Sequence, residues 1–329
     1  MRLRYFGRLM VQKRTGEGGK NSFFKNGWQR KIVLNRRNFC KLAALTACVY
    51  PMDVSAALHL LATDQEKNPV LPTQDVHLSG LPVPAQKITD DKIKDYLSKI
   101  RHPDILHPTD IILAEKDNQL LVTIVARFQR LYKNIGYGNF GVVSFDNALK
   151  IARDYPIVGE FTPAELEFLE MIYYRNARDY GFYGEKRVVK LTQHINKKDI
   201  YKVPYSGNYL FKGSSFAKYE EIKKDLGEEV LLTSGIRGLV KQFYLYLNKV
   251  ARHDGNLSLA SRSLAPPGYS YHATGDFDIG QAGFGNNNFS EKFIGTPVFQ
   301  KLAAQGYVEY RYQRDNMLGV RYEPWHVKL

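Results

Sequence analysis

Two short runs near the C-terminal end of the chain constrain its fold more than any other feature. The first reads Ser-Tyr-His-Ala-Thr-Gly-Asp-Phe-Asp over residues 270–278, and the second reads Glu-Pro-Trp-His over residues 323–326. Together they supply two imidazoles, carboxylates that can bind a metal, and a further glutamate. A catalytic zinc site needs three protein ligands, an open position for water and a nearby carboxylate that moves the proton. The two runs therefore predict a metal site that joins segments far apart in the sequence.

The spacing within each run requires a break in regular structure. A straight strand rises about 3.3 Å per residue and would separate His272 from Asp278 by roughly 20 Å, whereas two ligands of one zinc ion lie within roughly 4 Å of each other. The chain must double back between them, and Gly275 can adopt the positive φ that this needs. In the second run, an offset of three places Glu323 and His326 on opposite faces of a strand. The proline between them favours a break there.

Cysteine does not supply the ligands, because the only two, Cys40 and Cys48, lie in a basic N-terminal segment. The chain has 329 residues, of which 44% are hydrophobic and 24% charged, as in ordinary soluble proteins. Its formal charge is +14, but residues 1–56 hold twelve basic and only two acidic residues. The remainder is close to balanced, so the composition does not favour a nucleic-acid partner.

The basic N-terminal segment has the features of an export signal. Residues 35–41, Asn-Arg-Arg-Asn-Phe-Cys-Lys, resemble a twin-arginine signal. A mildly apolar run follows over residues 42–52, and Val-Ser-Ala at 54–56 suits cleavage. The run is shorter than the roughly 20 apolar residues that a permanent membrane span needs. We therefore interpret residues 1–56 as a twin-arginine-type signal and expect a protein exported to the periplasm or cell envelope, without an integral membrane span.

Two other interpretations of this segment remain open. Leu-Thr-Ala-Cys at residues 45–48 resembles a lipoprotein processing box, which makes Cys48 a candidate lipid anchor. A basic tail with a chance pair of arginines is the simplest alternative.

Residues 57–90 are rich in Pro, Gln, Asp and Thr and are interpreted as a linker. Residues 91–185 are expected to be mainly helical, with helices over 120–132 and 146–154. Thr162, Pro163 and Glu165 form a capping box with proline at the first helical position. The glycine-rich run over 136–141 follows a predicted helix and lacks a Lys-Ser/Thr ending, so we expect a turn rather than a nucleotide-binding loop.

From about residue 186 the sequence pattern predicts strands as well as helices. We expect strands over 186–191 and 229–233, helices over 238–253 and 297–305, a hairpin of 307–313 with 319–322, and a last strand that carries Glu323 and His326. This order lacks regular βαβ alternation and predicts an α+β fold with an antiparallel sheet.

The motifs of the C-terminal part resemble those of the VanY-type D-alanyl-D-alanine carboxypeptidases, a zinc peptidase family that shares its fold with the hedgehog N-terminal domain. The matching motifs are Ser-x-His-x-x-Gly at 270–275 with an Asp soon after it, Glu-x-Trp-His at 323–326, and Ser-Gly-x-Arg at 234–237. The resemblance covers roughly residues 195–329. It implies that residues 186–329 form a zinc carboxypeptidase domain of the hedgehog/DD-peptidase type, preceded by the helical region.

The resemblance also implies roles for individual residues. The implied zinc ligands are His272, Asp278 and His326, with Glu323 as catalytic base and Arg237 facing the substrate carboxylate or the developing oxyanion. Ser234, Gln242, Ser270 and Tyr271 are the candidate substrate-binding residues. The family aspartate lies seven residues after the histidine, whereas Asp278 lies six after it and Asp276 lies four after it. Asp276 is therefore a rival ligand, although the apolar neighbours of Asp278 favour Asp278.

The activity that the resemblance implies is zinc-dependent removal of the terminal D-alanine from peptidoglycan stem peptides. An endopeptidase or L,D-carboxypeptidase remains an alternative, because stereochemical preference depends on the shape of the pocket. A non-catalytic, zinc-stabilised wall-binding module is a second alternative. Glu323 argues against that module, since a purely structural metal site needs no base beside it.

Overall fold

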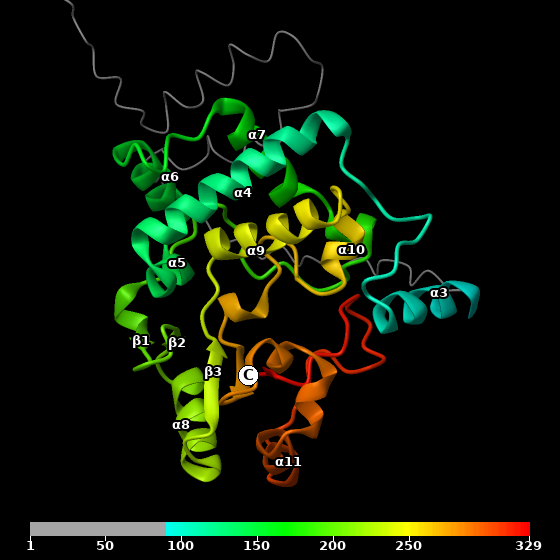
Figure 1. The fold of residues 1–329 in the computed structure, drawn as a ribbon, viewed down its shortest axis with the longest axis vertical. Helices are drawn as coiled ribbons and strands as arrows, with labels where there is room; N and C mark the ends of the chain where they lie inside the picture. The colour runs from blue at the N-terminus through cyan, green and yellow to red at the C-terminus, as the bar shows by residue number, and fades with distance from the viewer. Residues whose placement is uncertain (1–89) are drawn as a thin grey trace, which may run out of the picture. The chain divides into compact units, whose positions relative to one another are not determined.

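The computed structural model of the chain describes residues 90–329 (Figure 1). These residues lie in one compact unit that spans Leu78–Leu329. The predicted export signal, the candidate lipid anchor at Cys48 and all but the last residue of the predicted linker lie outside the described residues. Within residues 90–329, no helix combines the length and the apolar character that a membrane span requires.

Residues before 186 are mainly helical, as predicted. The elements are α3 (Asp90–Arg101), α4 (Glu115–Ile135), α5 (Tyr137–Val142), α6 (Phe145–Asp154), α7 (Pro163–Tyr174) and the short 3-10 helix η1 (Ala177–Tyr180). The capping box of α7 is confirmed: Thr162 accepts a hydrogen bond from the Glu165 backbone, and the Glu165 carboxylate accepts one from the Thr162 backbone. The expected turn over 136–141 is confirmed only at Gly136, because the rest of the run forms α5.

The C-terminal part mixes short helices with short strands. Its elements are η2 (Lys197–Asp199), β1 (Ile200–Lys202), β2 (Tyr209–Phe211), α8 (Ser214–Leu226), β3 (Val230–Ser234), α9 (Leu239–Arg252), α10 (Leu257–Ser261), η3 (Tyr271–Ala273), β4 (Phe277–Gln281), η4 (Gly285–Phe289), η5 (Glu291–Gly295), α11 (Pro297–Ala304) and β5 (His326–Val327). All strand pairs are antiparallel: β1 pairs with β2, and β3, β4 and β5 form a second sheet in that order. The α+β prediction is confirmed.

Two hydrophobic cores support these elements. In the first, α4 packs against α9, and α5, α6 and α7 surround this pair (Figure 1). The face that α4 buries follows helical spacing, and so does that of α9. The buried apolar residues with this spacing are Leu121, Ile124, Phe128 and Leu131 on α4, and they include Val240, Phe243, Leu247 and Val250 on α9. Because α9 follows Arg237 directly, this core anchors one side of the candidate site.

The second core lies around the three-stranded sheet, with α8 and α11 packed beside it (Figure 1). Its central strand, β4, is almost entirely buried. Phe277 and Ile279 point into this core on either side of Asp278 in the sequence, and Trp325 is buried within it. The alternation of side chains along β4 therefore turns Asp278 to the opposite face, away from the apolar core.

Two predicted strand segments are wrong, and the last strand is shorter than expected, because β5 begins at His326 and does not include Glu323. Residues 186–191 form no strand, because the backbone N–H groups of Arg187 and Val188 both donate to the Gly268 carbonyl instead of a partner strand. The hairpin of 307–313 with 319–322 is also absent. Its backbone groups bond to other segments: Arg321 donates to the Arg262 carbonyl, and the Leu318 carbonyl accepts from Tyr183. Alternating polarity without a pairing partner does not make a strand.

Candidate metal centre

Three side chains predicted as metal ligands converge in the described part of the chain. A ring nitrogen of His272, a carboxylate oxygen of Asp278 and a ring nitrogen of His326 all lie within 4.8 Å of one another. Each of the three residues is 2–3% exposed. The two imidazole rings stand nearly perpendicular, with centroids 5.0 Å apart. The three side chains therefore lie close together, as the sequence predicted for ligands of one metal ion.

The three-stranded sheet brings two of these side chains together. Asp278 on the central strand β4 pairs with Ser234 on β3 and with His326 on β5. His272 lies in η3, and the chain turns at Thr274 and Gly275 before β4 begins. Gly275 has φ of 139°, so the doubling back expected at this glycine occurs.

The ring of His272 is oriented by the backbone. Its Nδ1 lies 3.0 Å from the carbonyl oxygen of Gly235 and must donate a proton to it, because a carbonyl only accepts. Nε2 is then left with a lone pair, 3.2 Å from Asp278 Oδ1. Burial, reinforced by the Arg237 guanidinium, lowers the pKa of His272 to about 4. A neutral imidazole with one free nitrogen is the form that binds a metal.

The ring of His326 is held from two sides. Its Nδ1 lies 3.1 Å from Asp278 Oδ1, and its Nε2 lies 2.8 Å from Asp276 Oδ2. Burial alone lowers the pKa of His326, but the hydrogen bonds to the two carboxylates outweigh burial and raise the pKa to about 9. The Nδ1 side of the ring faces the same carboxylate oxygen that His272 approaches.

The rival carboxylate, Asp276, lies on the far side of His326. Both nitrogens of one edge of Arg311, Nε and a terminal NH2, donate to its two oxygens, and the Leu329 backbone N–H donates to Oδ1 at 3.2 Å. Burial raises the pKa of Asp276, but the hydrogen bonds from His326 and Arg311 hold it well below its ordinary value. Asp276 therefore belongs to a layer of contacts behind His326, and the converging group contains Asp278.

The donor set fits a metal ion such as zinc. Two imidazole nitrogens and one carboxylate oxygen are the ligands of many catalytic zinc sites. The outward N–H of each ring already has an acceptor, the Gly235 carbonyl for His272 and Asp276 for His326. Such partners fix the ring orientation and the tautomer of metal-binding histidines.

Glu323 lies at the edge of this group. Its Oε2 is 3.9 Å from Nδ1 of His326, and its side chain is 12% exposed. A turn at Pro324 and Trp325 separates it from β5, so the break expected at this proline occurs. Burial raises the pKa of Glu323 to about 7, although His326 opposes the shift. A carboxylate with a pKa near neutrality is suited to exchange protons.

Arg237 connects the group to β3. One terminal nitrogen donates to Asp278 Oδ2 and to Ser234 Oγ, both at 3.2 Å. The Arg237 side chain is 12% exposed. Its backbone N–H donates to the His272 carbonyl, so this segment is tied to the histidine loop as well.

The other three candidate residues are buried near the site. Gln242 on α9 donates its amide to the Ala265 carbonyl, and Ser270 precedes η3. The Tyr271 ring lies under the Arg311 guanidinium at 3.7 Å from the ring centroid. Within residues 90–329, none of these three side chains forms a hydrogen bond with His272, Asp278 or His326. Their assignment to substrate binding stays a prediction.

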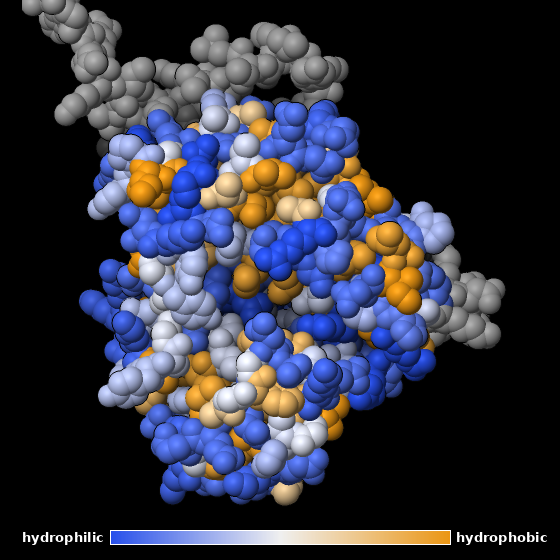
Figure 2. All heavy atoms as spheres, viewed as in Figure 1, coloured by the Kyte–Doolittle hydropathy of each residue, from blue (hydrophilic) through white to orange (hydrophobic). Residues whose placement is uncertain are grey.

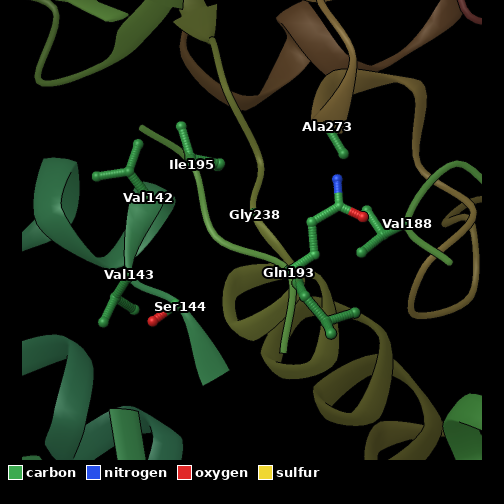
Figure 3. A pocket seen from close by; sticks show the side chains of 9 residues that line it. Val142, Val143, Ser144, Val188, Gln193, Ile195, Gly238 and Ala273 are labelled. Carbon is green, nitrogen blue, oxygen red and sulfur yellow. The ribbon is translucent and has the colours of Figure 1, made fainter. Parts of the chain in front are cut away.

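A pocket adjoins the group on the side of the helical region. Gly238 and Ala273, the residues after Arg237 and His272, form part of its wall. The other lining residues are Val142, Val143, Ser144, Val188, Gln193, Ile195 and Leu239. Figure 3 shows the Gln193 amide turned toward Ala273 and Val188. Figure 2 shows a hollow with a hydrophilic floor between α9 and the end of β3 in the view of Figure 1.

Sequence reasoning missed three features of the site: the Arg311–Asp276 pair, the Gly235 carbonyl behind His272, and the neighbourhood of Lys241 and Tyr137. The position of Asp276, two residues before Asp278, indicated a place near the site, but it predicted this residue only as a rival metal ligand. Nothing in the sequence indicated a role for Arg311, because residues 307–313 were expected to form one strand of a hairpin.

Fold and site together define an α+β domain with a buried His-Asp-His group of the kind found in metal-dependent hydrolases. The sequence model of the VanY family, D-alanyl-D-alanine carboxypeptidase, matches residues 214–329. The resemblance inferred from the motifs is therefore confirmed for this segment.

One solved structure that matches is the LdcB LD-carboxypeptidase, described as revealing the molecular basis of peptidoglycan recognition. It is 23% identical, with a TM-score of 0.33, over 39% of this chain. The chain covers 62% of the length of that structure. Comparison with curated proteins gave no match.

Proposed function

We propose that the protein is a zinc-dependent D-alanyl-D-alanine carboxypeptidase that trims peptidoglycan stem peptides. The observation that carries the proposal is the convergence of His272, Asp278 and His326 within 4.8 Å, with Glu323 at 3.9 Å from the second histidine. The match of residues 214–329 to the VanY family supports the substrate class.

The three converging residues would hold the zinc ion. A bound zinc ion supplies Lewis-acid polarisation of the peptide carbonyl and activation of water. The hydrogen bond from His272 to Gly235 and the hydrogen bond from His326 to Asp276 keep the two rings oriented toward Asp278. Preorganised ligands of this kind need little rearrangement when the ion binds.

Glu323 is the proposed base. It accepts the proton of the attacking water and passes the proton to the nitrogen of the leaving D-alanine. Its burial at the edge of the group favours a carboxylate that can both take and release a proton near neutral pH. Arg237 is the proposed partner of the substrate carboxylate, because its planar guanidinium binds carboxylates through paired hydrogen bonds.

The proposed location is outside the cytoplasm, in the periplasm or cell envelope. The proposal rests on the twin-arginine-like run at residues 35–41 and on the substrate class of the family. Cys48 remains a candidate site of lipid attachment.

The test is to incubate the zinc-loaded protein with a pentapeptide stem that ends in D-Ala-D-Ala and to analyse the products by mass spectrometry. Release of one D-alanine is the expected result. Cleavage of cross-linked dimers alone would favour the endopeptidase, and cleavage of a tetrapeptide stem alone would favour the L,D-carboxypeptidase. Zinc binding without cleavage of any of these substrates would favour the wall-binding module.

Glu323→Gln is the matched control. The variant should keep the metal content of the wild type, because Glu323 is not among the proposed ligands. It should lose two to four orders of magnitude in kcat, the usual effect of removing a general base. Full activity of this variant would rule out Glu323 as the base.

A further inference from the structure

Lys241, in the first turn of α9, is a buried cation without an acceptor. The residue is 5% exposed, and its Nζ has no hydrogen-bond partner among the described residues. The ammonium lies instead over the Tyr137 ring of α5, 4.3 Å from the ring centroid. Burying an ammonium without a hydrogen-bond partner is costly, so such a group is either strained or kept for a ligand.

Arg237 stands beside Lys241, four residues earlier in the chain. One terminal nitrogen of its guanidinium donates hydrogen bonds to Asp278 and Ser234. Its Nε is buried and has no acceptor among the described residues. Burial, reinforced by the Arg237 guanidinium and opposed by Asp278, lowers the pKa of Lys241 to about 7. Lys241 and Arg237 are therefore neighbouring basic side chains that each have a buried N–H donor without an acceptor among the described residues.

Tyr137 closes this region on the side of the helical region. Its hydroxyl lies 3.5 Å from the Thr233 carbonyl, in the strand that leads to Ser234. Tyr137 is 40% exposed, so its ring lies between Lys241 and solvent without closing the site completely. The charges of Arg237 and Asp278 both act on its hydroxyl. Tyr137 and Lys241 thus border the same group of side chains as the proposed metal centre.

We propose that Lys241 and Arg237 together bind the free C-terminal carboxylate of the substrate, with the Tyr137 ring covering Lys241. A carboxylate between two cations supplies the acceptors that both donors lack, and charge-assisted hydrogen bonds of this type are strong. The requirement for this carboxylate makes the site selective for peptides with a free C-terminus. Through Tyr137, the helical region would then contribute to substrate selection.

The choice of substrate in this inference rests on the proposed peptidase activity. The test does not depend on that activity, because it measures binding. Zinc-loaded wild type and Lys241→Met are titrated with N-acetyl-D-alanine and with N-acetyl-D-alaninamide, followed by NMR. The two probes differ only in the carboxylate. Lys249→Met is the matched control, because Lys249 lies on the same helix and faces Asp104 at 3.5 Å.

The expected result is that wild type and Lys249→Met prefer the acid, whereas Lys241→Met binds the acid about 10- to 100-fold more weakly, as for the loss of one charged hydrogen bond. Binding of the amide should be unchanged in all three proteins. Acid binding by Lys241→Met within twofold of wild type would overturn the proposal, and so would an equal loss of affinity for both probes.

Kinetics separates this inference from the proposed function. If the wild type cleaves stem peptides, Lys241→Met should raise KM for a free C-terminus and reduce the preference over a C-terminal amide. If no substrate is cleaved, the peptidase proposal fails, and the binding result alone decides on the carboxylate site. Lys241→Met should fold at least as stably as the wild type, because methionine fills similar space without a buried charge.

Discussion

Nε2 of His326 lies 2.8 Å from the carboxylate of Asp276, on the edge of the ring opposite the nitrogen that faces Asp278. Arg311 and the Leu329 backbone N–H hold that carboxylate in turn. The histidine is thus oriented by a residue only two positions before the proposed ligand. This chain of contacts makes Asp276 a positioning residue for His326 in the proposed metal centre, which has consequences that can be measured.

Replacing Asp276 by asparagine should weaken zinc binding about 10- to 100-fold, the usual effect of removing an outer partner of a metal-binding histidine. The amide keeps an acceptor but loses the negative charge that stabilises the N–H of His326. Competition with a chromophoric chelator measures the affinity. Asp315→Asn, at an exposed position, should behave as wild type. Equal affinities for Asp276→Asn and wild type would refute the positioning role.

Gly235→Ala should disturb both the fold and the metal centre. A Cβ at Gly235 would lie 2.1 Å from the Tyr209 carbonyl oxygen, so the backbone must move, and the Gly235 carbonyl orients His272. We expect a loss of about 1–3 kcal/mol in the free energy of unfolding, as for other overpacked sites, and weaker zinc binding. Urea denaturation measures the first effect. Gly295→Ala is the control, because its Cβ would meet no atom within 4 Å.

Zinc should raise the melting temperature, and a chelator should reverse the rise. A ligand that binds only the folded state at 100 times its Kd adds about 2.7 kcal/mol of stability. Differential scanning fluorimetry checks the shift. His272→Ala and Asp278→Asn should show little shift, whereas His253→Ala should shift as wild type does, since His253 lies at the far end of α9. A shift that survives in both ligand variants would place the ion elsewhere.

The pH dependence of stability should reveal Lys241. Its pKa is about 7 in the folded protein and near 10.5 when unperturbed. Between these values the unfolded chain binds more protons, so Lys241 makes stability increase as pH rises, by up to about 1.4 kcal/mol per pH unit. The penalty of its burial is complete below pH 7. Urea denaturation at pH 7 and pH 9 should show a smaller increase for Lys241→Met than for wild type, and identical increases would contradict the burial of a charged lysine.

Local chemistry made several elements predictable from sequence. The Thr162 capping box and the apolar period of 238–253 depend on residues within one or two turns, and both form as expected. The breaks near Gly275 and Pro324 were also predictable. A straight strand would hold His272 and Asp278 too far apart to bind one ion, and it would place Glu323 and His326 on opposite faces.

Features that depend on distant partners were not predictable. Residues 186–191 have strand-like composition, but the backbone N–H groups of Arg187 and Val188 donate to the Gly268 carbonyl and not to a neighbouring strand, so no ladder forms. Both Asp276 and Asp278 can bind a metal by chemistry alone. Only the path of the chain between η3 and β4 turns one toward His272 and the other toward Arg311. Lys241 likewise lies against the ring of Tyr137, which belongs to α5, a helix far earlier in the chain.

The placement of α9 has a consequence for fragments of this protein. The helix lies inside the segment that matches the VanY family, yet its apolar face is covered by α4, α5 and α6. The Gly141 carbonyl at the end of α5 also accepts the N–H of Gly238, next to Arg237. An excised C-terminal piece would leave aromatic surface open to water and free the arginine loop from its support, so homology boundaries are a poor guide for truncation here.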